Sequence, residues 1–260
     1  MEKSASNEIK KRFCDLSRRS YQNGQYTFTD FLSMADLSDF YEITKLPKDH
    51  EFYLSPAGYS VWGGYSDSER CMIRFGNEEE LGYEVPFPIC CISIKPLQKK
   101  FADDLSHRDF LGALINLGIE RTELGDILVK DKECFLFAKE SMAPLICNEL
   151  TRVRHTTVQA VVCEFDDNAY APDIVEGSIQ ASGFRIDSFL AKVLKLSRNA
   201  SSELFLSSKV FVNGRLMSNE SYQLKESDVI SVRGFGKFVF NGSSGSTRKG
   251  NHIISYSRYV

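Results

Sequence analysis

The sequence predicts an α+β protein built from three small modules, and three observations support this prediction. The chain has 260 residues, a length typical of two or three modest domains. Its central part alternates strand-like and helix-like segments in the order β-α-β-β-α-β. Its last part contains Asn213-Gly214 between alternating apolar residues, which is a strong hairpin pattern. We therefore expect domains at residues 1–80, 81–165 and 183–260.

The N-terminal module is expected to begin with two helices and to continue as a small sheet. Apolar residues recur at spacings of three and four over residues 7–21 and 29–43, and Thr29 and Asp30 supply an N-cap for the second helix. Strands are expected over residues 51–54, 59–62 and 71–75. The sequence thus predicts a small α/β domain that ends near residues 77–80.

The central module is predicted to be ferredoxin-like, the arrangement shared with RNA-recognition motifs. Its expected elements are a strand over 88–96, a helix over 107–117, a hairpin of 126–130 and 133–139, a helix over 141–150 and a strand over 156–164. Phe135 and Phe137 lie in a strand where RNA-recognition motifs stack bases, but no glycine or basic residue precedes them. Core packing is the favoured interpretation of these two rings, with RNA stacking as the alternative.

Charge is distributed unevenly along the chain. The net charge is −3, yet residues 183–260 hold 12 Lys and Arg against 5 Asp and Glu, a net charge of +7. The preceding 182 residues therefore carry −10. Such a division indicates a basic binding module attached to an acidic body, although basic residues can also merely solvate a surface.

Composition indicates a globular protein of the cytoplasm. The apolar fraction is 42%, no apolar run is long enough to span a bilayer, and the first residues do not have the pattern of a signal peptide. The seven cysteines contain no Cys-x-x-Cys pair and are interpreted as reduced core residues. The four histidines are scattered, so neither a metal nor another cofactor is expected.

The basic module is predicted to open with two short helices. Apolar residues recur at helical spacing from Ile186 to Leu194 and form one stripe. At 100° per residue, Arg185, Lys192 and Lys195 fall together about 130° from the centre of that stripe. Ser197 is a predicted N-cap of the second helix, which places Arg198 near the helix junction.

A sheet is predicted to follow these helices. The hairpin at Asn213-Gly214 follows Lys209 and returns through Arg215. Strands over 228–233 and 236–240 add Arg233 and Lys237, residues 241–246 are expected to form a hairpin loop, and a last strand is expected over 252–259. A connecting strand is expected over 174–181.

This basic block resembles the S4-type RNA-binding domain. The resemblance rests on Arg185-Ile186-Asp187, Leu196-Ser197-Arg198, the hairpin from Val210 to Arg215, and Asp228-Val229-Ile230-Ser231-Val232. It implies that the two helices and the hairpin present a basic surface to structured RNA. Ser208 and Ser227 stand where that family usually has glycines, and Ala200 stands where a basic residue is common. We therefore expect a modest affinity for RNA.

The resemblance extends to nearly the whole chain. Leu114-Ile115-Asn116-Leu117-Gly118-Ile119-Glu120-Arg121, Gly125-Asp126-Ile127-Leu128-Val129 and Arg233-Gly234-Phe235-Gly236 are similar to segments of the YlmH family of bacterial S4-domain RNA-binding proteins. This resemblance implies a factor that binds the large ribosomal subunit, with rRNA or tRNA as partner, during rescue of stalled translation. It also implies a gene near cell-division genes.

The expected RNA contacts follow from basic charge and from the helix starts. Arg198 is the leading candidate, because an arginine can bind a phosphate bidentately beside the amides of a helix N-terminus. Asp187 is expected to orient Arg185 or to cap the helix. The complete predicted set is Arg185, Lys192, Ser197, Arg198, Lys209, Asn213, Arg215, Arg233 and Lys237.

Two other functions compete with RNA binding. Enzyme activity is not expected. His107-Arg108-Asp109 resembles a kinase catalytic loop, but the other parts of a kinase site are missing. Arg185-Ile186-Asp187 resembles the setting of a pseudouridine synthase's catalytic Asp, but it belongs to the binding helix itself. The body is also too short for a pseudouridine synthase domain. A cell-division scaffold, whose acidic body binds protein and whose RNA binding is secondary, remains the alternative.

Overall fold

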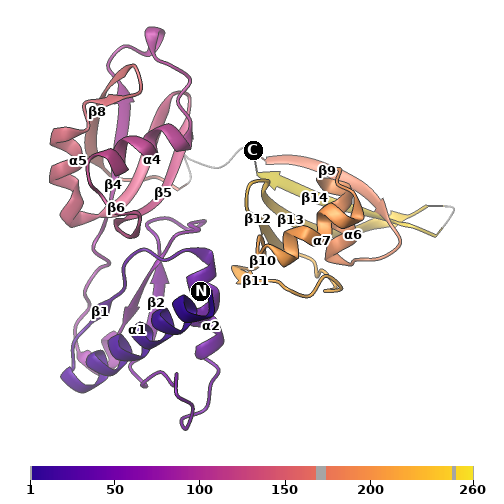
Figure 1. Ribbon diagram of the computed structural model, residues 1–260, viewed down its shortest axis with the longest axis horizontal. Coiled ribbons are helices and arrows are strands. Elements are labelled where there is room, and N and C mark those ends of the chain that lie inside the picture. Colours follow the sequence, from indigo (N-terminus) through magenta and orange to yellow (C-terminus); the bar gives the residue numbers. More distant parts are fainter. Residues whose placement is uncertain (1, 168–173, 248–249, 260) are drawn as a thin grey trace. The chain divides into compact units, whose positions relative to one another are not determined.

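The computed structural model describes residues 2–167, 174–247 and 250–259, and within them helices accompany three separate sheets (Figure 1). The predicted α+β class is therefore confirmed. The chain divides into unit 1, Met1–Ala169, and unit 2, Tyr170–Val260.

The N-terminal part of unit 1 combines helices with a small antiparallel sheet of strand order β1-β3-β2. Its elements are α1 (Glu2–Asn23), β1 (Thr27–Phe28), α2 (Met34–Ile43), β2 (Tyr59–Trp62), β3 (Met72–Phe75) and α3 (Glu78–Leu81). Phe13 of α1 and Phe40 of α2 pack edge to face, with ring centroids 5.4 Å apart, and both are fully buried. This contact joins the two helices over the sheet.

Two predictions for this part were wrong. Helix α2 begins after Ser33, whose hydroxyl accepts a hydrogen bond from the Asp36 amide while the Asp36 carboxylate accepts one from the Ser33 amide. This capping box starts the helix, whereas Thr29 pairs its backbone with Ile73. Residues 51 and 52 lie in a turn, closed by a hydrogen bond from the Tyr53 amide to the His50 carbonyl, and residues 53 and 54 are irregular, so no strand forms there.

The central part of unit 1 has the predicted β-α-β-β-α-β order, with one additional two-residue strand, β7 (Arg152–Val153), before the last strand. Its main elements are β4 (Ile89–Pro96), α4 (His107–Asn116), β5 (Leu124–Lys130), β6 (Glu133–Lys139), α5 (Ala143–Glu149), β7 (Arg152–Val153) and β8 (Thr156–Cys163). The strands form one antiparallel sheet in the order β5-β6-β4-β8-β7. Helices α4 and α5 cover one face of it and enclose a core that contains Phe110, Leu114 and Ile146 (Figure 1).

The predicted boundary at residue 80 lies inside unit 1. Phe31 and Met72 from the N-terminal part form a buried cluster with Cys91 and Phe137 of the central sheet. The Arg70 guanidinium reinforces this contact, because it donates to the carbonyls of Phe31, Arg121 and Leu124 at 2.9–3.2 Å. The two parts therefore share a core.

The Asp126 carboxylate lies at the same contact between the two parts of unit 1. Asp126 of β5 accepts hydrogen bonds from the Tyr65 hydroxyl at 3.0 Å and from the backbone amides of Glu69 and Arg70 at 2.7 and 3.2 Å. Burial raises the pKa of Asp126, and these hydrogen bonds oppose that shift. Burial likewise lowers the pKa of Arg70 to about 10.

Unit 2 is a six-stranded antiparallel sheet with two helices on one face (Figure 1). Its elements are β9 (Ile174–Ala181), α6 (Ile186–Val193), α7 (Arg198–Leu206), β10 (Val210–Val212), β11 (Arg215–Leu216), β12 (Asp228–Val232), β13 (Gly236–Ser246) and β14 (His252–Tyr259). The strand order is β11-β10-β12-β13-β14-β9. Phe189 of α6 and Leu204 of α7 are buried against Val210, Ile230 and Phe238 of the sheet.

The sheet of unit 2 departs from the prediction at two places. Strand β9 pairs with β14 along its whole length, so the sheet begins before the predicted domain start at residue 183. Residues 241–246, predicted as a loop, belong to β13, because register shifts after Phe240 and Ser243 accommodate the glycines and the strand continues to Ser246. The sequence placed the boundary between body and basic module at residues 166–172, of which residues 168–172 lie outside the described residues.

Candidate nucleic-acid interface

The first turns of α6 and α7 lie side by side in unit 2. Arg185 is the N-cap of α6, and Arg198 is the first residue of α7. The Ser201 hydroxyl of α7 donates a hydrogen bond of 3.0 Å to the backbone carbonyl of Asp187 in α6, which holds the two turns together. Two helix N-termini, each with an arginine, are thus brought to one place on the surface.

Arg185 is held in position by Asp187. Its guanidinium donates Nε to one carboxylate oxygen at 3.1 Å and Nη2 to the other at 2.7 Å, in a bidentate pair. These hydrogen bonds lower the pKa of Asp187 and raise the pKa of Arg185. The Arg185 side chain is still 48% exposed. The geometry is that of a carboxylate orienting an arginine, as expected, with donors of the guanidinium left for a ligand.

Arg198 is the second exposed cation of this pair of turns. Its neighbour Ser197 caps α7, because the Ser197 hydroxyl accepts from the Ala200 amide at 3.2 Å. Within the described part of the chain, the Arg198 side chain is exposed and has no hydrogen-bond or ion-pair partner. Ser197 thus has a structural role, whereas the Arg198 guanidinium can turn toward an anion at the helix N-terminus.

The helical alignment predicted for Arg185, Lys192 and Lys195 was wrong. Arg185 precedes α6 with an extended ψ of 133°, and Lys195 follows the helix with a left-handed φ of 55°. Of the three residues only Lys192 lies within α6, so helical spacing does not place Arg185 and Lys195 beside it. The Lys192 ammonium donates to the backbone carbonyl of Gln180 in β9, so it connects the helix to the sheet.

The hairpin between β10 and β11 is fastened by its own asparagine. Asn213 and Gly214 have φ of 51° and 74°, the pair of positive values that a type I′ turn requires. The Asn213 side chain donates to the Asp228 carboxylate at 2.8 Å and accepts from the Val229 amide at 2.9 Å. Most of its hydrogen-bonding capacity is therefore used inside the fold. Arg215, which follows the turn, is exposed.

Lys209, Arg233 and Lys237 lie toward the face of the sheet opposite to the helices. Phe211, Ser231 and Lys237 are paired across strands β10, β12 and β13. Each is next in sequence to a residue that faces α6 and α7, so its side chain lies on the other face of the sheet. The Arg233 guanidinium lies 5.1 Å from the centroid of the buried Phe211 ring, and its amide donates to the Lys209 carbonyl. The structure therefore does not bring all nine predicted residues to one surface.

One exposed cation of unit 2 lies outside the predicted set, and sequence reasoning missed the backbone role of two serines. Arg258 of β14 is exposed and lies 5.6 Å from the Phe238 ring centroid. Alternation along the last strand was the only pattern that could have identified it. Ser208 and Ser227 have φ of 53° and 70°, which explains why glycine suits these positions.

The open face of the central sheet in unit 1 is covered where a base would stack in an RNA-recognition motif. Phe137 is 1% exposed and lies against Tyr65, with ring centroids 4.9 Å apart and an interplanar angle of 20°. Phe165 packs edge to face on both Phe137 and Phe135. Core packing, the favoured interpretation, is therefore confirmed for Phe137, and Phe135 is half-buried in the same cluster.

Two kinds of feature are absent from residues 2–167, 174–247 and 250–259. No helix there combines the length and the apolar character needed to cross a bilayer. No group of three or more His, Cys, Asp or Glu side chains there could hold a metal ion.

Comparison with known proteins identifies similarities along most of the chain. Residues 84–167 match the family model described as "Putative RNA-binding domain in YlmH". A Bacillus subtilis (strain 168) protein named ribosome-associated protein quality control protein P2 is 27% identical over 202 residues, which cover 77% of this chain and 78% of the relative. A solved structure of cell division protein ylmH from Streptococcus pneumoniae has a TM-score of 0.44 and 19% identity, and covers 61% of this chain and 91% of that one.

Proposed function

Since the chain belongs to the YlmH family, we propose that it is a non-catalytic RNA-binding protein that docks on structured RNA, rRNA or tRNA, of the large ribosomal subunit. In this proposal unit 2 is an S4-type module, the central part of unit 1 is a ferredoxin-like module, and the protein acts in the cytoplasm in rescue of stalled translation. The name of the Bacillus subtilis relative, a ribosome-associated quality control protein, supports the ribosomal part of the proposal.

The observation that carries the proposal is the adjacency of Arg185 and Arg198 at two joined helix starts. RNA helices are recognised largely through phosphates, 2′-hydroxyls and shape, and such recognition needs cations at fixed positions. The Arg185 side chain is fixed by Asp187, whereas the Arg198 guanidinium extends freely from the capped start of α7. The Ser201 hydrogen bond joins the two helix starts, so both arginines are available to phosphates of one bound RNA.

The proposal is tested by sedimentation of cell lysate on a sucrose gradient. The wild-type protein is expected to travel with the large subunit, and the double variant Arg185→Ala plus Arg198→Ala to stay at the top. Lys225→Ala plus Arg258→Ala, two exposed cations of unit 2 outside the predicted set, removes the same charge and is expected to travel as wild type does.

Ribonuclease and salt separate RNA docking from a scaffold function. Wild-type protein should leave the subunit fraction after ribonuclease treatment and as salt rises, because phosphate contacts are weakened by counterions. If the wild-type protein and both double variants remain at the top at low salt, ribosome docking is wrong. The same conclusion follows if sedimentation of the wild-type protein is insensitive to ribonuclease. The cell-division scaffold would then be the better hypothesis.

A further inference from the structure

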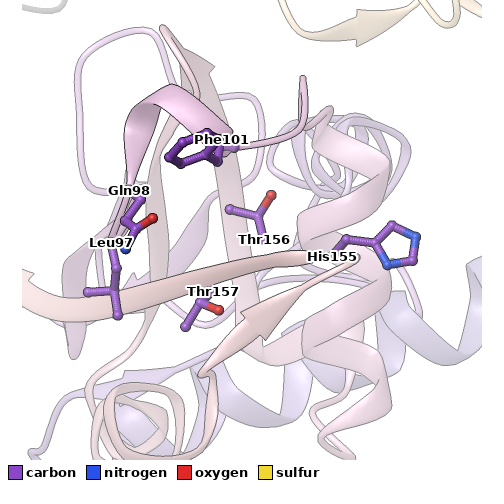
Figure 2. A pocket seen from close by; sticks show the side chains of 7 residues that line it. Leu97, Gln98, Phe101, His155, Thr156 and Thr157 are labelled. Atoms are coloured by element: carbon purple, nitrogen blue, oxygen red, sulfur yellow. The ribbon is translucent and has the colours of Figure 1, made fainter.

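The loop that leaves β4 exposes two large apolar side chains at one edge of the central sheet. Leu97 is 61% exposed and Phe101 is 76% exposed. They line a cavity of about 270 Å³ together with Gln98, His155 and Thr157 (Figure 2). Exposed apolar side chains that gather at one cavity, as these two do, can mark a binding site.

The loop that carries Phe101 is anchored to the sheet by a hydrogen bond on each side of the ring. The Leu97 amide donates to the Thr157 carbonyl at 3.0 Å, and the Asp103 amide donates to the Thr156 hydroxyl at 2.9 Å. Between these two anchors the chain makes a single 3-10 turn, Lys99–Phe101. A ligand that meets this ring therefore encounters a preorganised surface.

Cations accompany the exposed ring. The Lys100 ammonium lies 5.8 Å from the centroid of Phe101. The ammonium groups of Lys95 and Lys99 lie 3.3 and 3.4 Å from the two carboxylate oxygens of Glu133, which keeps both lysines beside the loop. Lys100 beside the ring, together with Lys99 of the same turn, favours an anionic ligand that also has a flat apolar face.

Nucleotides have that combination of properties. A base stacks on an aromatic side chain whatever its sequence, and lysines follow the phosphate backbone. The cavity beside the ring is lined by an amide, an imidazole and a threonine hydroxyl, which can bond to base edges. The open face of the sheet is a poorer place for a base, because Tyr65 and Phe165 already cover Phe137.

We propose that unit 1 binds an unpaired nucleotide of RNA at this edge, with the base stacked on Phe101 and the phosphates beside Lys99 and Lys100. This inference rests on the proposed RNA-binding function and assigns to unit 1 a single-stranded partner distinct from the structured RNA of unit 2.

The test measures binding of the purified full-length protein to two RNAs by fluorescence anisotropy: a labelled single strand of about 12 nucleotides and a labelled hairpin. Phe101→Ala is expected to weaken single-strand binding about 5- to 100-fold, the effect of losing one stacked base, and to leave hairpin binding unchanged. Phe101→Trp is expected to retain binding. Tyr21→Ala, which truncates a 57% exposed ring on α1, is the matched control and should bind as wild type does.

Photocrosslinking gives a second readout that does not depend on affinity. A single strand containing 5-iodouridine should crosslink to Phe101, and the crosslinked peptide is identified by mass spectrometry. The inference is overturned if Phe101→Ala binds the single strand as wild type does and no crosslink maps to residues 97–101. A protein partner would then be the better assignment for this surface. Loss of hairpin binding in the Arg185 and Arg198 double variant is a separate result, which reports on the proposed function alone.

Discussion

Two surfaces of this protein carry the residue types of RNA recognition, yet their surroundings differ. On the open face of the central sheet, aromatic rings occupy the expected strand, but the N-terminal part of unit 1 and Phe165 bury Phe137. At the starts of α6 and α7, Arg185 and Arg198 are exposed. Asp187 accepts hydrogen bonds from Arg185, and Ser197 caps the helix that begins at Arg198. The difference shows that a residue in a recognition position contributes to binding only where packing leaves it accessible.

The largest effect is expected from truncating a ring in the buried cluster around Phe137. Phe137→Ala should lower the free energy of unfolding by about 3–5 kcal/mol, because it removes a fully buried ring stacked on Tyr65. Urea denaturation measures the loss. Phe135→Ala, at a half-buried ring of the same cluster, should cost less. An unchanged stability together with weakened RNA binding in Phe137→Ala would show that the sheet face is a recognition surface after all.

The exposed side of the comparison is tested through the salt dependence of binding. Arg198→Ala should weaken binding to a hairpin RNA by about 1.5–3 kcal/mol and reduce the salt slope by about 0.7–0.9, the effects of losing one phosphate contact. Anisotropy titrations at several salt concentrations measure both quantities. Lys237→Ala, on the face away from the helices, should leave the slope as it is. Equal effects of the two substitutions would mean that RNA contacts both faces.

A smaller effect on stability is expected in unit 2, where Ser227 has a positive φ. Ser227→Gly should raise the free energy of unfolding by about 0.5–1 kcal/mol, because removing the cost of a left-handed φ of 70° outweighs the greater freedom of glycine in the unfolded chain. Thermal unfolding of the variant measures the gain. Ser221→Gly, where φ is not positive, should be destabilising and serves as the control. A loss of stability in both variants would contradict this account.

The smallest effect concerns the ion pair at the start of α6. The pKa of Asp187 is lowered in the folded state, so the pair stabilises the fold above the ordinary carboxyl pKa, and this stability is lost as pH falls through the lowered value. Arg185→Ala should therefore raise the pKa of Asp187 toward its ordinary range. An NMR titration of the Asp187 carboxyl carbon measures the change, and Lys225→Ala is the control. An unmoved pKa would show that the Ser188 amide, and not Arg185, sets it.

Local patterns in the sequence were sufficient for many of the elements. The Asn213-Gly214 turn, the capping serine at 197 and the β-α-β-β-α-β order of the central part all appear where they were predicted. Each of these features depends on a few neighbouring residues, through positive φ, a side chain that reaches the third amide, or a change in apolar period. Helix ends were harder to place, because the end is decided by a competing hydrogen bond elsewhere, as at Thr29, whose backbone pairs with Ile73.

The sequence by itself determined the α+β class, the basic character of the last module and the arginines at its helix starts. Only the tertiary structure decided that Phe137 is buried, that Lys237 lies on the sheet face away from the helices and that Phe101 is exposed beside Lys100. The physical reason is that accessibility depends on which distant segments pack together. Tyr65 and Phe137 are far apart in the chain, and no local spacing reports that their rings stack.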